Sequence, residues 1–178
     1  MDRREVLYFG QGRLCKLAES IFTPSGNYAL RSVLLGVLLS TPGVLIFGLF
    51  AALDPKMSPD TYRLLSTESE IRAAYGSIVL SPLLETLILT VLFLVSSKFN
   101  YGANAAFYTS TVVFAWLVHS KRGVFVIPAI LAFIFFATQL LCFYQSRGIG
   151  PALVGVTLTH IINNAIIFSL NIRMQSFV

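Results

Sequence analysis

Three side chains that can do acid–base chemistry lie within or beside long apolar stretches of this 178-residue sequence. Glu85 is the only charged residue between Gly76 and Ser97, and His119 and His160 are the only histidines. A carboxylate or an imidazole can take a proton from water, and nearby donors can stabilise an oxyanion. A lone carboxylate in bilayer hydrocarbon costs roughly 2.5–3.5 kcal/mol. We therefore expect Glu85 to have polar partners in a buried site.

The composition is that of a membrane protein. Hydrophobic residues make up 56% of the chain and charged residues 12%, whereas about a quarter of a soluble domain is charged. The mean hydropathy is +0.77. We predict one membrane domain over 1–178, with membrane lipid as a partner. The net charge is +5, but the sequence has no basic face with interleaved aromatic residues, which argues against nucleic acid as a partner. Cys15 and Cys142 have no metal-type spacing and indicate no disulfide framework.

The apolar runs predict an all-α, polytopic membrane helical bundle of about five transmembrane helices. The N-terminal segment 1–28 is an interfacial segment in this interpretation, and 13–22 is compatible with an interfacial helix. A short surface helix is expected within 54–75. Five Lys or Arg among the first 31 residues favour a cytoplasmic N-terminus. The five predicted spans cover 32–53, 77–97, 104–119, 123–144 and 151–170.

Depth in the membrane predicts that the polar residues meet. Glu85 lies roughly 12 Å from the start of the second span at 1.5 Å per residue. Because alternate spans run in opposite directions, His119, His160 and Asn164 lie towards the same side of the membrane. His160 and Asn164 are four residues apart and so share a helix face. Asn163 competes with Asn164 from an adjacent face.

Three short motifs occur together in a characteristic order. They are Ser-Pro-Leu-Leu-Glu at 81–85, Phe114 upstream of His119, and His160-x-x-x-Asn164. This set resembles the CPBP family, which comprises CAAX proteases and bacteriocin-processing enzymes and is also called Abi. These proteins are intramembrane glutamic proteases with motifs Pro-x-x-Glu-Glu-x-x-x-Arg, Phe-x-x-x-His and His-x-x-x-Asn or Asp.

The sequence departs from these motifs at three places. Thr86 replaces the second glutamate, and Thr90 replaces the arginine. Phe114 stands five residues before His119 instead of four, and Ala115 occupies the expected position. These changes remove the usual charged neighbours of the first glutamate.

The resemblance covers the predicted core helices over 77–170 and implies an intramembrane peptidase. Its substrate would be a membrane-associated protein or peptide, and it would use no cofactor or metal. Glu85 would activate water with help from His119, while His160 and Asn164 would stabilise the oxyanion. The departures motivate an alternative, a catalytically inactive scaffold that binds a membrane protein partner.

Other interpretations of the same residues remain open. Glu85 as a protonated acid, His119 as an interfacial residue and Asn164 as an interhelical hydrogen-bond donor are structural ones. Two histidines and one glutamate are also a residue set that can ligate a catalytic zinc ion, although no His-Glu-x-x-His motif occurs. A proton-coupled carrier would use Glu85, but no internal repeat supports it. The compact chain without a targeting extension indicates a prokaryotic cytoplasmic (inner) membrane.

Overall fold

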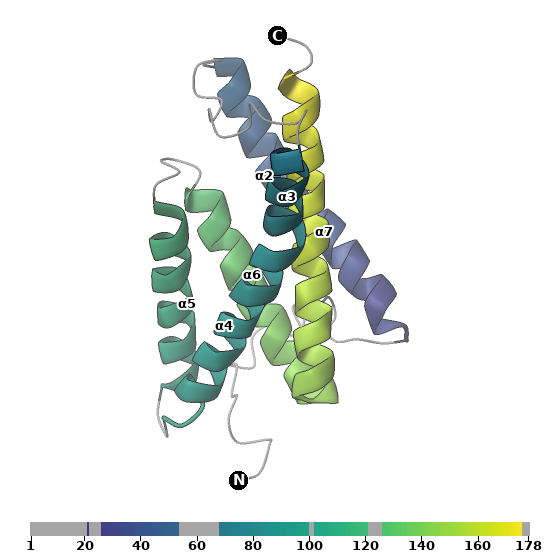
Figure 1. Ribbon diagram of the computed structural model, residues 1–178. Helices are drawn as coiled ribbons and strands as arrows, with labels where there is room; N and C mark the ends of the chain where they lie inside the picture. The colour runs from purple at the N-terminus through teal and green to yellow at the C-terminus, as the bar shows by residue number, and fades with distance from the viewer. Residues whose placement is uncertain (1–20, 22–25, 54–67, 100–101, 121–125, 176–178) are drawn as a thin grey trace.

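The computed structural model describes residues 21, 26–53, 68–99, 102–120 and 126–175, and their regular structure is entirely helical. The all-α prediction is confirmed for these residues. The predicted interfacial helix at 13–22 lies, apart from Ile21, outside them. The helices in chain order (Figure 1) are α2 (Tyr28–Leu53), α3 (Glu68–Tyr75), the π-helix η3 (Gly76–Leu80), α4 (Ser81–Ser96), α5 (Ala103–His119), α6 (Val126–Arg147) and α7 (Ile149–Gln175).

Three described helical segments are long and apolar enough to cross a membrane. These three segments match the second, fourth and fifth predicted spans. Their length and apolar composition indicate an integral membrane protein. The predicted count of about five spans is not confirmed. Helix α5 has 17 residues, or about 25 Å, against roughly 30 Å of bilayer hydrocarbon. The described apolar part of α2, Tyr28–Thr41, is also shorter. The three segments are Gly76–Ser96, Val126–Arg147 and Ile149–Ser169.

Local sequence signals account for where several helices begin and end. The side chain of Asn27 accepts hydrogen bonds from two backbone N–H groups at the start of α2, at 3.1 and 3.2 Å, which is N-cap geometry. Gly102 precedes α5 with a φ of 81° and Gly148 separates α6 from α7 with a φ of 84°. Both need the left-handed region that glycine enters without steric cost. Pro151 then lies in the first turn of α7, where no intrahelical donor is lost.

Helix α7 is the central element of the bundle. It packs most extensively against α2, which crosses behind it, and against α6, with α4 and η3 on a further side (Figure 1). Small residues permit the close crossing with α2. A Cβ added at Gly36 would lie 2.7 Å from the Cβ of Ile162 and 2.8 Å from the carbonyl oxygen of Thr159. The α2 backbone therefore approaches α7 at a distance that only glycine allows.

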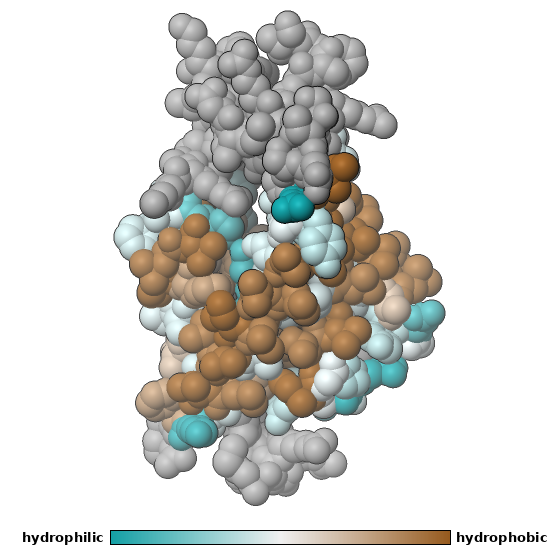
Figure 2. Space-filling view, in the orientation of Figure 1, coloured by the Kyte–Doolittle hydropathy of each residue, from teal (hydrophilic) through white to brown (hydrophobic). Residues whose placement is uncertain are grey.

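Aromatic side chains fill the interior between α4, α5 and α6. Phe93 makes edge-to-face contacts with Phe107 and Tyr144, with ring centroids 5.5 and 4.9 Å apart. The outer surface is apolar as well, since Leu84, Trp116 and many similar residues are more than half exposed. Figure 2 shows hydrophobic residues spread across much of the coloured part of the visible face. An apolar exterior around a packed interior is the distribution expected of helices in lipid.

Candidate functional site

The carboxyl group of Glu85 and the imidazole of His160 meet inside the bundle. Nε2 of His160 lies 3.4 Å from Oε2 of Glu85. The two residues come from α4 and α7, and they are only 8% and 4% exposed. The meeting predicted from membrane depth is confirmed for this pair. An acid and an imidazole in contact, away from bulk solvent, can exchange a proton or hold a water molecule between them.

Ser81 holds the other carboxylate oxygen of Glu85. Its hydroxyl donates a hydrogen bond to Oε1 at 2.5 Å. The residues are four apart on one helix and therefore share a face. The carboxyl group is thus fixed from two sides, by Ser81 within its own helix and by His160 across the helix interface. Ser81 belongs to the Ser-Pro-Leu-Leu-Glu motif, and its spacing of four residues from Glu85 was the available signal for this bond.

Two phenylalanines from α6 surround the imidazoles. The ring of Phe136 lies against His160 with centroids 4.2 Å apart and 32° between the planes. Phe133 contacts both histidines, since its centroid is 5.7 Å from that of His119 and 5.7 Å from that of His160. His119 is 7% exposed. Both imidazoles therefore contact the ring of Phe133, and the meeting of His119 with Glu85 stays a prediction.

Asn164 lies at the same helix interface, one turn beyond His160. Its amide nitrogen donates a hydrogen bond to the backbone carbonyl of Ser77 at 3.0 Å. Its amide oxygen accepts one from Asn163 at 3.3 Å. Asn164 therefore bonds between helices, which is the structural alternative considered above. One of its two amide hydrogens is used by Ser77, and one remains for another acceptor.

The positions at which the sequence departs from the CPBP motifs lie in the interior. Thr86 is 1% exposed, and its hydroxyl oxygen has no hydrogen-bond partner among the described residues. Thr90 donates instead to the carbonyl of Thr86, at 2.9 Å. Ala115 is fully buried, and Phe114 makes an edge-to-face contact with Phe133 at 5.5 Å. Of the two threonines, only Thr90 thus bonds the backbone through its hydroxyl.

A second buried polar cluster was missed by the sequence analysis. Gln139, on α6, donates a hydrogen bond to the hydroxyl of Thr159 at 2.8 Å, and that hydroxyl lies 3.0 Å from the carbonyl oxygen of Ser32 on α2. The cluster joins three helices directly beside His160. A single glutamine inside an apolar run was the available signal, since it must find partners in the interior.

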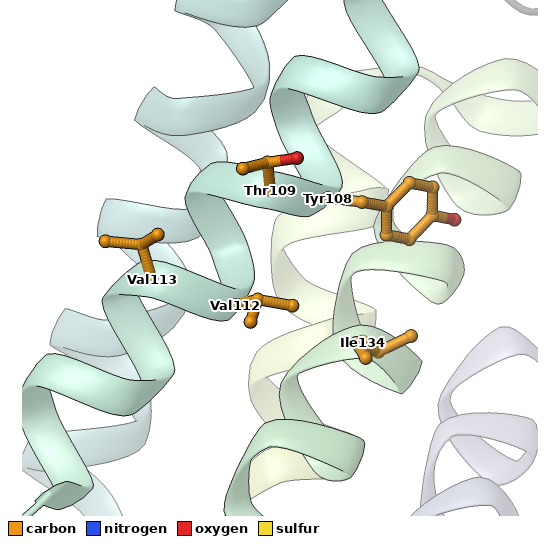
Figure 3. Close-up of a pocket in the computed structure, with 5 residues that line it drawn as sticks. All are labelled: Tyr108, Thr109, Val112, Val113 and Ile134. Carbon is orange, nitrogen blue, oxygen red and sulfur yellow. The ribbon is translucent and has the colours of Figure 1, made fainter.

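Two grooves on the described surface are lined by residues other than Glu85 and His160. A groove of about 460 Å³ lies between α5 and α6, lined by Tyr108, Thr109, Val112, Val113 and Ile134 (Figure 3). The hydroxyl of Tyr108 is 3.0 Å from that of Thr138, so the groove offers few unbonded polar groups. Within the part of the chain that the structure describes, no three His, Cys, Asp or Glu side chains group together as metal ligands.

No protein-family model matches the sequence, and no curated protein or solved structure matches it.

Proposed function

We propose that this chain is a divergent CPBP-type intramembrane peptidase that hydrolyses a peptide bond of a membrane-associated protein or peptide. The single observation that carries the proposal is the buried contact between Glu85 and His160, 3.4 Å apart on two packed helices. Intramembrane ionisable residues are costly and are functional by default. The proposed location is a prokaryotic cytoplasmic membrane.

In the proposed reaction the Glu85 carboxylate takes a proton from a water molecule as that water attacks the scissile carbonyl carbon. The new C–O bond forms while the carbonyl electrons move to the oxygen. His160 donates to this oxyanion, and the second amide hydrogen of Asn164 is placed one turn away to do the same. The protonated Glu85 then gives its proton to the leaving nitrogen as the C–N bond breaks. Each such group contributes on the order of 10²-fold or more.

His119 has a supporting place in this scheme. It reaches His160 through the ring of Phe133, with equal centroid separations of 5.7 Å on the two sides. We assign it the positioning of the attacking water. In the arrangement described, Nε2 of His160 faces Glu85 directly, so water and substrate must enter between the two side chains before hydrolysis.

The route for water is proposed to follow η3. Ser77 is exposed, and a Cβ placed at Gly76 would meet no atom within 4 Å. Ser77, Ser81 and Glu85 follow one another at intervals of four residues, so polar groups lead from this exposed turn to the carboxyl group. Backbone with exposed polar groups at membrane depth is tolerated where it borders water or protein.

The experiment uses purified protein in liposomes with two peptide probes, one prenylated and one a bacteriocin leader, in ¹⁸O-labelled water. Hydrolysis by activated water puts ¹⁸O into the new carboxyl terminus of the product. Glu85→Gln is expected to abolish this product, while Ser169→Ala, an exposed change on the same helix as His160, is expected to retain it. Undiminished cleavage by Glu85→Gln contradicts the proposed mechanism.

A second candidate is a catalytically inactive subunit that binds a membrane protein partner. Thr86 and Thr90 favour it, because their hydroxyls cannot replace the charges of the family's glutamate and arginine. Capture of the same partner from native membranes by the wild type and by Glu85→Gln, without cleavage of that partner by either, would support this candidate.

A further inference from the structure

The helix that carries Glu85 changes its hydrogen-bond register just before that residue. From Glu68 to Ser96 the chain is helical throughout, but Gly76–Leu80 forms a π-helix. Its register is visible in the backbone N–H of Ser81, which donates to the carbonyl of Gly76, five residues earlier. Such insertions widen a helix by one residue and recur at functional sites.

The next carbonyl in this register lacks its backbone donor. Five residues after Ser77 stands Pro82, which has no N–H group. Because Pro82 cannot donate, the Ser77 carbonyl must take its hydrogen bond from another side chain or from water. The amide nitrogen of Asn164 reaches this oxygen at 3.0 Å. A side chain of α7 thus takes the place of the missing proline donor.

This bond forms a second link beside the Glu85–His160 contact. Asn164 follows His160 by one turn of α7, so the two side chains lie on one face. On the other helix, the carbonyl of Ser77 points towards the C-terminal end, while the side chain of Glu85 leans towards the N-terminal end. The two links therefore lie at neighbouring heights and fix both the rotation and the height of α7 relative to α4.

We propose that Asn164 is a positioning residue. Its hydrogen bond to the Ser77 carbonyl, which Pro82 leaves without a backbone donor, holds His160 against Glu85. This role requires only the geometry of the helix pair, and it stands whether or not the chain is an enzyme. The positioning role differs from oxyanion stabilisation because only the positioning role depends on the residue at position 82.

The dependence on Pro82 gives a specific test by a double-mutant cycle with Asn164→Ala and Pro82→Ala. Alanine at 82 restores a backbone N–H. The Ser77 carbonyl then has a donor in either register, from residue 82 in the π form or from residue 81 in the α form. Asn164→Ala is expected to lower the Tm of the detergent-solubilised protein by several degrees. In the Pro82→Ala background its effect is expected to fall to less than half.

The second readout is the infrared band of the Glu85 carboxyl group, identified by its absence in Glu85→Gln. Asn164→Ala is expected to shift this band, and Pro82→Ala is expected to return it towards the wild-type frequency. Ser169→Ala, an exposed change on the same helix, is the control, with the same effect in both backgrounds. If Asn164→Ala cannot be recovered from membranes, recovery of the double variant is the expected result.

Equal effects of Asn164→Ala in the two backgrounds, or loss of both single and double variants, would overturn the proposal. These readouts do not measure proteolysis. Failure of the peptidase proposal would leave them unchanged, and failure of the cycle would leave the Glu85→Gln cleavage test intact.

Discussion

The imidazole of His160 lies against the ring of Phe136, with centroids 4.2 Å apart and 32° between the planes. Phe136 is 1% exposed, so this ring cannot turn away without opening the core. The contact sets the plane in which the imidazole can rotate and keeps Nε2 directed at Glu85. An aromatic wall behind a histidine is thus part of how the acid–imidazole pair is held.

Replacing this wall tests its role. Phe136→Ala is expected to reduce the free energy of unfolding by about 3–5 kcal/mol, because it leaves a cavity. Phe136→Leu keeps more of the volume and is expected to cost less than Phe136→Ala, yet it still removes the aromatic contact. The imidazole ¹⁵N resonances of His160 should change in both variants. Leu131→Ala, on the exposed side of the same helix, is the control, and unchanged His160 resonances in Phe136→Leu would contradict the assigned role.

The crossing of α2 and α7 predicts intolerance of a single methyl group. Gly36→Ala would bring the new Cβ within 2.8 Å of the Thr159 carbonyl oxygen, so the helices must separate. We expect a loss of about 1–3 kcal/mol from overpacking, measured by thermal or denaturant unfolding in detergent. Gly150→Ala, at a position with no atom within 4 Å of the added carbon, should be neutral or slightly stabilising. Equal unfolding stability of the Gly36→Ala and Gly150→Ala variants would exclude the close crossing of α2 and α7.

The sequence allowed some of this arrangement to be predicted. Uninterrupted apolar runs predict the helices, and helix direction and depth bring Glu85 and His160 together. The rotation of each helix was not predictable, because the polar residues of α2 and α7 are not gathered on one face that would mark an outside. Their contacts depend on small residues such as Gly36, whose meaning appears only when Thr159 lies opposite.

The hydrogen bond from Asn164 to Ser77 was equally hidden. It depends on a change from α to π register at Gly76–Leu80, which leaves no clear mark in the residue types. Pro82 was visible in the sequence, but the carbonyl that it leaves unbonded depends on the register. Membrane depth predicted that Asn164 lies on the same side as His160, but it could not show which acceptor Asn164 meets.

The buried amide cluster predicts an asymmetry between two substitutions. Thr159→Val leaves the amide nitrogen of Gln139 without the 2.8 Å bond and also removes the contact with the Ser32 carbonyl. Gln139→Leu removes an amide whose oxygen has no partner among the described residues. Interhelical hydrogen bonds in membranes average roughly 0.6 kcal/mol, with a maximum near 1.7. We therefore expect Thr159→Val to lower unfolding stability more than Gln139→Leu. The reverse order would show that the cluster is bonded differently.

Ser81 is predicted to orient the Glu85 carboxyl group. Ser81→Ala removes the hydrogen bond to Oε1 and is expected to cost about 1–3 kcal/mol, the range for bonds to charged or buried groups. It should also shift the infrared band of the Glu85 carboxyl. Ser81→Thr retains a hydroxyl and should keep most of both properties. An unshifted band in Ser81→Ala would mean that the hydroxyl does not bond the carboxyl in the membrane.

The most direct measurement compares peptide termini in native membranes that carry the wild-type chain or its Glu85→Gln variant. Glutamine keeps the size and the hydrogen-bonding oxygen of the side chain but cannot accept the proton from water. We predict that a small set of new termini in membrane-associated proteins or peptides is present with the wild type. These termini should be absent with Glu85→Gln at equal protein abundance. Identical sets of termini in the two membranes would contradict catalysis by Glu85.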